Sequence, residues 1–170
     1  VESYWNLHAT TESMELSKES IVIWDGYFLK SVKEPDSLSR EKMLWASHLA
    51  GKAINITRTT GPHALSNFLT ANYGVAHGQA VALFLPLFFL YNEPGTDLLE
   101  LMGCSSVFEA KEKIERMMSS AGLAMKLSEL GINKDSVINL LLEDVNEERF
   151  ANNPVPFDKE KLTGLINENL

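Results

Sequence analysis

Apolar side chains recur every three to four residues through most of the chain, and no alternating apolar and polar pattern continues for more than a few residues. A recurrence of apolar residues every three to four positions is typical of an amphipathic helix, whereas apolar and polar residues alternate in a half-buried strand. The sequence therefore predicts an all-α protein, built as a multi-helix bundle. No repeat and no long linker divides the chain, so we expect residues 1–170 to form a single helical domain.

Breaks in this pattern give the expected limits of the helices. Pro35 ends the first helix, because the residue before a proline is disfavoured in the helical conformation. Ser106 and Glu109 form a capping-box pattern, in which each side chain satisfies a backbone N–H of the first helical turn. The expected helices run from Glu12 to about Val32, from about Ser39 to Ile54 or Ile56, from Gly78 to Tyr91, from Ser106 through Met118, from Ser136 to about Val145, and from Asp158 to the end.

Between these helices we expect a turn at residues 92–95, a break at 131–135 and a loop at 151–156. Four small residues in the second helix would permit close helix packing; they are Ala46, Ala50, Gly51 and Ala53.

Composition and charge narrow the class of protein. Apolar residues make up 45% and charged residues 22%, which is typical of a globular protein. The apolar run from Ala80 to Tyr91 contains Pro86 and is shorter than the roughly 20 residues of a membrane span, so it predicts a buried helix. A net charge of −8 argues against a nucleic-acid surface. The lone cysteine, Cys104, and the absence of a signal-peptide pattern favour a cytoplasmic location.

Two of the four histidines, His63 and His77, lie in the segment GPHALSNFLTANYGVAHG. On one unbroken helix their 14-residue separation would place them about 21 Å apart, too far to bind one ion. Asn72 and Gly74 favour a turn between them, and an extended stretch from residue 70 to 77 could bring the rings together. Gly78 would permit the close approach of a ligand or of another backbone. Two interpretations remain open: the two rings are ordinary buried imidazoles, or they are metal ligands. In the second case they are only half of a site, because catalytic metals usually have three or four protein ligands.

The same segment carries a family resemblance. His63-Ala-Leu and Ala76-His77-Gly78, with their histidines fourteen positions apart, resemble the C-terminal helical domain of the iron-containing (group III) alcohol dehydrogenases, where the second motif is usually P-H-G. The opening VESY is similar to the end of that family's D-A-L-x-H-A-x-E-S-Y pattern. The ending NNPVPFDKEKL resembles its N-P-R-P segment and final helix.

This resemblance implies a dehydroquinate synthase-like fold and hydride transfer between NAD(P)H and a carbonyl carbon. It implies that His63 and His77 are two of four ligands to a divalent iron or zinc ion. The other two ligands and the dinucleotide-binding domain would precede Val1. Asn67 stands where the family often has another histidine, so a proton relay at that position loses its usual residue.

The segment GKAINITRTTGPHALS resembles the branch of the family that reduces phosphonoacetaldehyde. Lys52, Arg58 and Thr57 would supply donors for an anionic head group, together with the neighbouring hydroxyls of Thr59 and Thr60. The alternative is that Lys52 and Arg58 are solvated helix residues. His48 could line the same cleft, but we expect it, like His8, to be a surface or packing residue.

The parent protein is therefore expected to be a metal-dependent NAD(P) alcohol dehydrogenase that acts on a small aldehyde. One alternative is a relative of glycerol dehydrogenase or dehydroquinate synthase, which use zinc. Another is a catalytically inert helical domain, and for residues 1–170 alone we expect weak or no metal binding. We expect a small aldehyde or alcohol as the binding partner and neither nucleic acid nor a membrane; a homodimer stays open.

Overall fold

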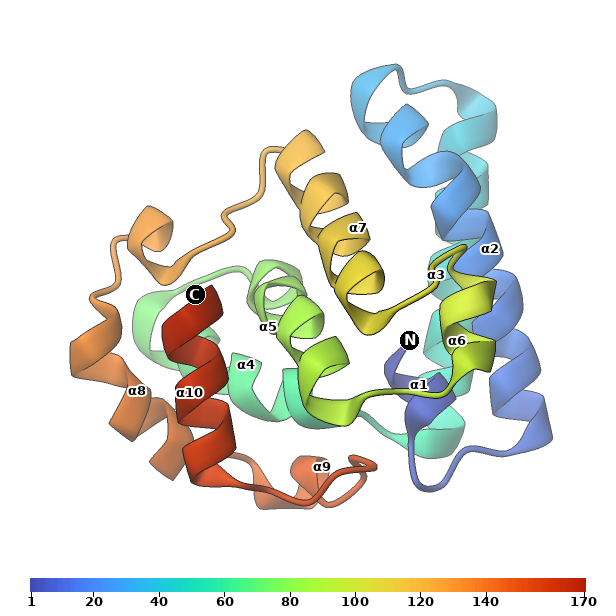
Figure 1. Ribbon diagram of the computed structural model, residues 1–170. Coiled ribbons are helices and arrows are strands. Elements are labelled where there is room, and N and C mark those ends of the chain that lie inside the picture. Colours follow the sequence, from blue (N-terminus) through green and yellow to red (C-terminus); the bar gives the residue numbers. More distant parts are fainter.

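Helices form all of the regular structure, which confirms the predicted all-α class (Figure 1). The computed structural model describes residues 1–170 throughout. The α-helices are α1 (Glu2–Trp5), α2 (Thr11–Lys33), α3 (Ser37–Thr57), α4 (Gly61–Tyr73), α5 (His77–Asn92), α6 (Thr96–Leu101), α7 (Val107–Ser120), α8 (Lys134–Glu143), α9 (Glu147–Phe150) and α10 (Lys159–Asn169), and η1 (Leu127–Leu130) is a short 3₁₀ helix. None of these helices combines the length and the hydrophobicity of a membrane-spanning segment.

The long helices α2 and α3 pack side by side along one edge of the molecule, while α5 lies at the centre of the remaining helices (Figure 1). α5 contacts α4, α7 and α10, and its apolar side chains point in every direction, as in a helix buried on all sides. Pro86 lies inside α5 without ending it. The prediction of a buried helix from this apolar run is confirmed. Its fully buried side chains include Leu83, Phe84, Leu87, Phe88, Phe89 and Tyr91.

The main helices begin and end within a few residues of their predicted limits, and side-chain caps explain the differences. Asp36 accepts a hydrogen bond from the Ser39 amide and starts α3 two residues earlier than predicted. Asn133 caps α8 in the same way, so this helix also starts and ends two residues earlier. At α7, Ser106 accepts from the Glu109 amide as predicted. The Glu109 carboxylate, however, accepts from Ser105 rather than from Ser106, so the capping box is not reciprocal.

Three short helices, α1, α6 and α9, and the turn η1 were not predicted, because four to six residues carry too little of the helical period. The expected close packing in α3 is partly wrong. Ala46 and Ala53 are buried, but Gly51 is exposed with open space around it. The glycine that does require its small size is Gly61, where an added Cβ would lie 1.9 Å from Cε1 of Phe88.

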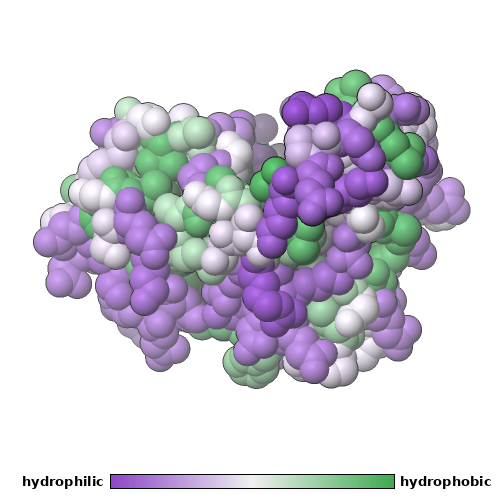
Figure 2. Space-filling model, turned by 90° about the horizontal axis from the view of Figure 1, so that it is seen from above, coloured by the Kyte–Doolittle hydropathy of each residue, from purple (hydrophilic) through white to green (hydrophobic).

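An apolar cavity of about 480 Å³ lies between the α2–α3 pair and helices α5 and α7. Seen from above, the surface shows a notch between the α2–α3 lobe and the other helices, with hydrophobic residues within it (Figure 2). Glu2 and Gly78 line one part of this cavity, so it borders the histidine pair. Its other lining residues include Val1, Ile21, Trp24, Phe28, Ile54, Leu85 and Met117.

Candidate metal and substrate site

The junction of α4 and α5 brings His63 and His77 together. α4 ends at Tyr73, and Gly74 caps it with φ of 65°, in the left-handed region that favours glycine. Only residues 74–76 connect the two helices, and His77 is the first residue of α5. The imidazole centroids lie 5.2 Å apart with an angle of 64° between the rings. The chain therefore turns as predicted, although helix α4 continues through residues that we expected to be extended.

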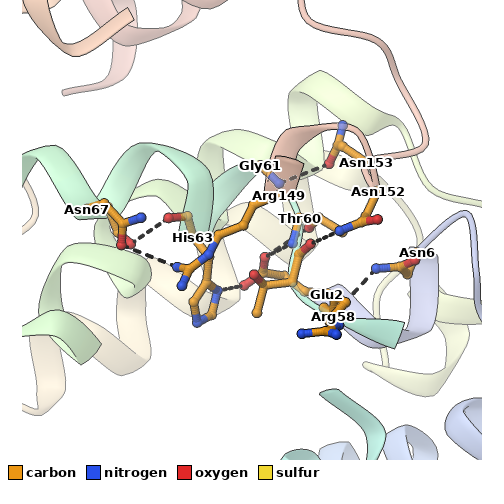
Figure 3. Close-up of polar contacts among 12 residues, drawn as sticks. Glu2, Asn6, Arg58, Thr60, Gly61, His63, Asn67, Arg149, Asn152 and Asn153 are labelled. Atoms are coloured by element: carbon orange, nitrogen blue, oxygen red, sulfur yellow. Dashed lines mark hydrogen bonds and ion pairs between the residues drawn. The ribbon is translucent and has the colours of Figure 1, made fainter. Parts of the chain in front are cut away.

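A buried carboxylate supports the first of these imidazoles. Oε1 of Glu2 is in hydrogen-bond contact with Nδ1 of His63 (Figure 3). Oε2 of Glu2 accepts from both the amide and the hydroxyl of Thr60, each at 2.9 Å. The Trp5 indole N–H donates to the same hydroxyl at 3.1 Å. Both oxygens of Glu2, which is only 7% exposed, therefore have partners that hold them in place.

The pKa of the Glu2 carboxyl reflects these contacts. Burial acts to raise this pKa, but the hydrogen bond and charge of His63 and the donors of Thr60 outweigh burial and hold it below its usual range. When the His63 ring is neutral, the ionised Glu2 accepts the proton on Nδ1, and the lone pair of Nε2 is then free. A carboxylate behind one ring nitrogen is the usual support for a histidine that binds metal through the other.

Glu2 was not predicted to have a role, although it lies in the VESY segment. Its partner is 61 residues away, so no local pattern marks the contact. A carboxylate among the buried residues Ser3, Tyr4 and Trp5 was the one signal that could have drawn attention to it.

His77 is more exposed than His63. Burial, together with the nearby charges of His63 and Arg149, lowers the pKa of the His77 imidazole below its ordinary value. This ring is therefore neutral at neutral pH, which is the form that binds metal ions.

Arg149 of α9 is a second residue that the sequence did not indicate. One of its terminal nitrogens donates to Oδ1 of Asn67 at 3.3 Å (Figure 3). Asn67 occupies the position where the resemblance implies a further histidine, in addition to His63 and His77. It lies one turn after His63 on α4. The half-buried Arg149 takes part in none of the chain's ion pairs.

The backbone around the start of α4 is fixed by contacts from distant segments. The Asn152 side chain donates to the Thr59 carbonyl at 3.0 Å, and the Gly61 amide donates to Oδ1 of Asn153 at 3.4 Å. Asn6 donates to the Arg58 carbonyl at 3.4 Å (Figure 3). The first turn of α4, which carries His63, is therefore held from both ends of the chain.

The predicted substrate residues lie in different environments. Thr57 is buried, and its hydroxyl contacts the carbonyls of Ala53 and Arg58 at 3.2 and 2.9 Å. Lys52 and Arg58 are both exposed, and Arg58 lies just beyond the last residue of α3 with φ of 68°. The Thr57 hydroxyl, which is buried and bound to backbone carbonyls, is therefore not free to bind an anion, whereas the side chains of Lys52 and Arg58 are exposed.

The remaining histidines lie on the surface, as predicted. His48 packs against Trp45 with ring centroids 5.3 Å apart, and His8 is exposed. Gly78 is exposed, and nothing lies within 4 Å of the position of an added Cβ. This space leaves room for a ligand, but no backbone approaches Gly78 closely.

The histidine pair fits a metal ion as a partial ligand set. Metal–nitrogen bonds of about 2.1 Å place two imidazole centroids on one tetrahedral ion about 5 Å apart, and the observed separation is 5.2 Å. Imidazole nitrogen suits both iron and zinc. No third histidine, cysteine or carboxylate in residues 1–170 completes a cluster. Glu2 cannot serve as that ligand while both of its oxygens bind Thr60 and His63.

The fold and the placement of these residues define the helical domain of a dehydrogenase family. The chain belongs to the Fe-containing alcohol dehydrogenase family, whose C-terminal model matches residues 1–170.

Two characterised relatives match nearly all of the chain. It is 27% identical over 186 residues to the phosphonoacetaldehyde reductase of Streptomyces viridochromogenes, a match that covers 98% of this chain and 46% of the relative. It is 27% identical over 171 residues to long-chain-alcohol dehydrogenase 1 of Geobacillus thermodenitrificans, covering 92% of this chain and 43% of the relative. The chain thus spans about half the length of these oxidoreductases.

Solved structures share the fold. The sulfoacetaldehyde reductase of Bifidobacterium kashiwanohense, in complex with NAD⁺, superposes with a TM-score of 0.88 and 24% identity, over 99% of this chain and 46% of that one. A 1,3-propanediol oxidoreductase superposes with a TM-score of 0.87 and 26% identity, over 98% of this chain and 47% of that one. These likenesses confirm the predicted fold, and the family model confirms the predicted family.

Proposed function

We propose that residues 1–170 are the metal- and substrate-binding part of an NAD(P)-dependent oxidoreductase that interconverts a small aldehyde and its alcohol. His63 and His77 are two of the ligands to a divalent iron or zinc ion. The observation that carries this proposal is the pair of imidazoles 5.2 Å apart with the Glu2 carboxylate on Nδ1 of the first. The other ligands and the nicotinamide-binding residues come from outside these residues, since two imidazoles do not complete a catalytic site.

A bound divalent ion supplies Lewis acidity that polarises the carbonyl oxygen of the substrate. Glu2 keeps the His63 proton on Nδ1 and so presents Nε2 as a ligand. Thr60 and Trp5 hold that carboxylate, which prevents the ring from turning away. The Asn67 carboxamide does not titrate, so the proton taken up by the alcohol oxygen comes from a group other than this side chain.

Phosphonoacetaldehyde is the first substrate to test. One relative carries that compound in its name, and a protein of the same fold is named for sulfoacetaldehyde, another short aldehyde with an acidic group. Other relatives are named for neutral alcohols, namely long-chain alcohols and 1,3-propanediol. An anionic and a neutral aldehyde therefore belong in the same assay.

The experiment uses the full-length protein loaded with Fe²⁺ or Zn²⁺, with NADH or NADPH and with phosphonoacetaldehyde or propionaldehyde. Metal content is measured for wild type, His63→Ala, His77→Ala and His48→Ala, the last being an exposed histidine outside the site. We expect the first two variants to lose metal and activity and the third to keep both. If His63→Ala retained its metal and its rate, the proposal would be wrong.

A further inference from the structure

Arg149 is a cation without an anionic partner. It is half-buried, and the one hydrogen bond of its side chain goes to the neutral carboxamide of Asn67. A guanidinium carries five N–H donors in a planar fork that matches the oxygens of phosphonate, sulfonate or carboxylate. Asn67 thus binds one terminal nitrogen of the guanidinium and leaves most of the fork unused.

This cation lies at the histidine pair rather than on a remote surface. Its partner Asn67 is one helical turn beyond His63 on α4, and its charge acts on His77. The Arg149 side chain extends from α9 toward Asn67 (Figure 3).

The position of Arg149 is set by its own helix. The side chain of Asn146 caps α9 by accepting from the Arg149 amide at 2.9 Å. Three residues later, Asn152 binds the Thr59 carbonyl just before α4. The backbone of Arg149 is therefore held relative to His63, as a residue that orients a substrate must be.

A positive side chain beside a divalent ion is unfavourable unless an anion compensates it. Glu2 is the carboxylate nearest the histidines, but its oxygens are bound to His63 and Thr60. The acidic residues near Arg149 in sequence, Asp144, Glu147 and Glu148, are exposed and form no ion pair with it. The compensating negative charge is thus missing from the residues around this cation.

We propose that Arg149, oriented by Asn67, binds the anionic group of the substrate, so that the site selects a short aldehyde bearing a phosphonate, sulfonate or carboxylate. This inference rests on the proposed function and names its substrate class. Arg149 takes the role for which the sequence favours Lys52, Arg58 and Thr57; of these, Thr57 is buried with its hydroxyl bound to backbone carbonyls. Because Arg149 and the histidines are neighbours, the acidic group lies within a few bonds of the aldehyde carbon.

The test compares phosphonoacetaldehyde with propionaldehyde in the full-length, metal-loaded protein. We expect Arg149→Gln to lower the ratio of kcat/KM for the anionic aldehyde to kcat/KM for the neutral one by about 30-fold, mainly through KM, which is the size expected for a charge-assisted contact. Arg149→Lys should give a ratio between those of wild type and Arg149→Gln, because lysine keeps the positive charge but lacks the planar fork of donors. Arg40→Gln, which removes an exposed arginine on α3, should leave the ratio unchanged.

An unchanged ratio in Arg149→Gln would overturn the inference, and so would an equal loss with both aldehydes. A ratio that falls in Arg58→Gln instead would return the role to the residue favoured by sequence. If wild type reduced neither aldehyde, the proposed function would fail, and calorimetric binding of phosphonoacetate to the metal-free protein would then decide. Loss of that binding in Arg149→Gln supports the inference, and equal binding refutes it.

Discussion

Replacing Glu2 by glutamine should move the proton on the His63 ring. The substitution keeps the shape of the side chain but turns one acceptor oxygen into an NH₂ donor. Thr60 directs two donors, its amide and its hydroxyl, at one oxygen of Glu2. The carbonyl oxygen of the glutamine must therefore face Thr60, and its NH₂ must face Nδ1 of His63. Nδ1 then has to accept, so the proton of the neutral ring moves to Nε2.

The energies favour this arrangement over its alternative. Turning the amide around would set its NH₂ against both Thr60 donors, and leaving two buried donors unpaired costs about 2–6 kcal/mol. A change of tautomer leaves every one of these donors satisfied. The cost to stability should be smaller, about 1–3 kcal/mol, because hydrogen bonds to a charged acceptor are replaced by neutral ones. In the metal-loaded protein, the loss of Nε2 as a ligand should weaken metal affinity by about 10- to 100-fold.

The assay is a long-range ¹H–¹⁵N correlation spectrum of the histidine rings in the metal-free chain, recorded above the ordinary histidine pKa. We expect the proton of His63 on Nδ1 in wild type and on Nε2 in Glu2→Gln. Glu12→Gln, an exposed residue at the start of α2, is the control and should match wild type. The same His63 tautomer in wild type and Glu2→Gln would refute the reasoning, whatever happened to metal affinity.

Two further predictions concern stability and ionisation. Gly61→Ala should lower the free energy of unfolding in urea by about 3 kcal/mol or more, because its Cβ would lie 1.9 Å from a ring carbon of the buried Phe88. Gly51→Ala, in open space on α3, should instead raise it by up to about 1 kcal/mol, and the reverse order would contradict the packing argument. Burial, aided by the hydrogen bond to Asp97, raises the pKa of Tyr4 to about 12. The protonated side chain therefore contributes its full stabilisation at pH values below the unfolded pKa of about 10. This contribution is lost as the pH rises toward 12. Ultraviolet titration should find late-ionising tyrosines, because burial raises the pKa of Tyr91 as well, and the ionisation of Tyr4 should shift downward in Asp97→Asn; ionisation of every tyrosine near pH 10 would contradict this.

The long helices could be predicted because their signal is local. Several turns of apolar periodicity lie within each element itself, so α2, α5 and α10 begin and end within one or two residues of their predicted limits. The short helices α1, α6 and α9 are held by tertiary contacts that no local window contains.

The same distinction separates the parts of the site. His63 and His77 could be paired from sequence because one turn at Gly74 connects them. Glu2 and Arg149 could not be found in this way, since their partners lie 61 and 82 residues away. Lys52 was chosen as a substrate donor because it is charged and near in sequence. Charge and sequence distance do not say which face of α3 a side chain occupies.

The precision of the site depends on polar contacts at the first turn of α4. Asn153 joins the amide of Gly61 to the side chain of Asn92, and all three residues are buried. Gly61 cannot shift toward α5 because Phe88 already fills the space beside it. The loop after α9 and the end of α5 therefore fix the backbone two residues before His63. Since α9 also carries Arg149, the same loop sets the distance between the proposed anion-binding group and the proposed metal ligands.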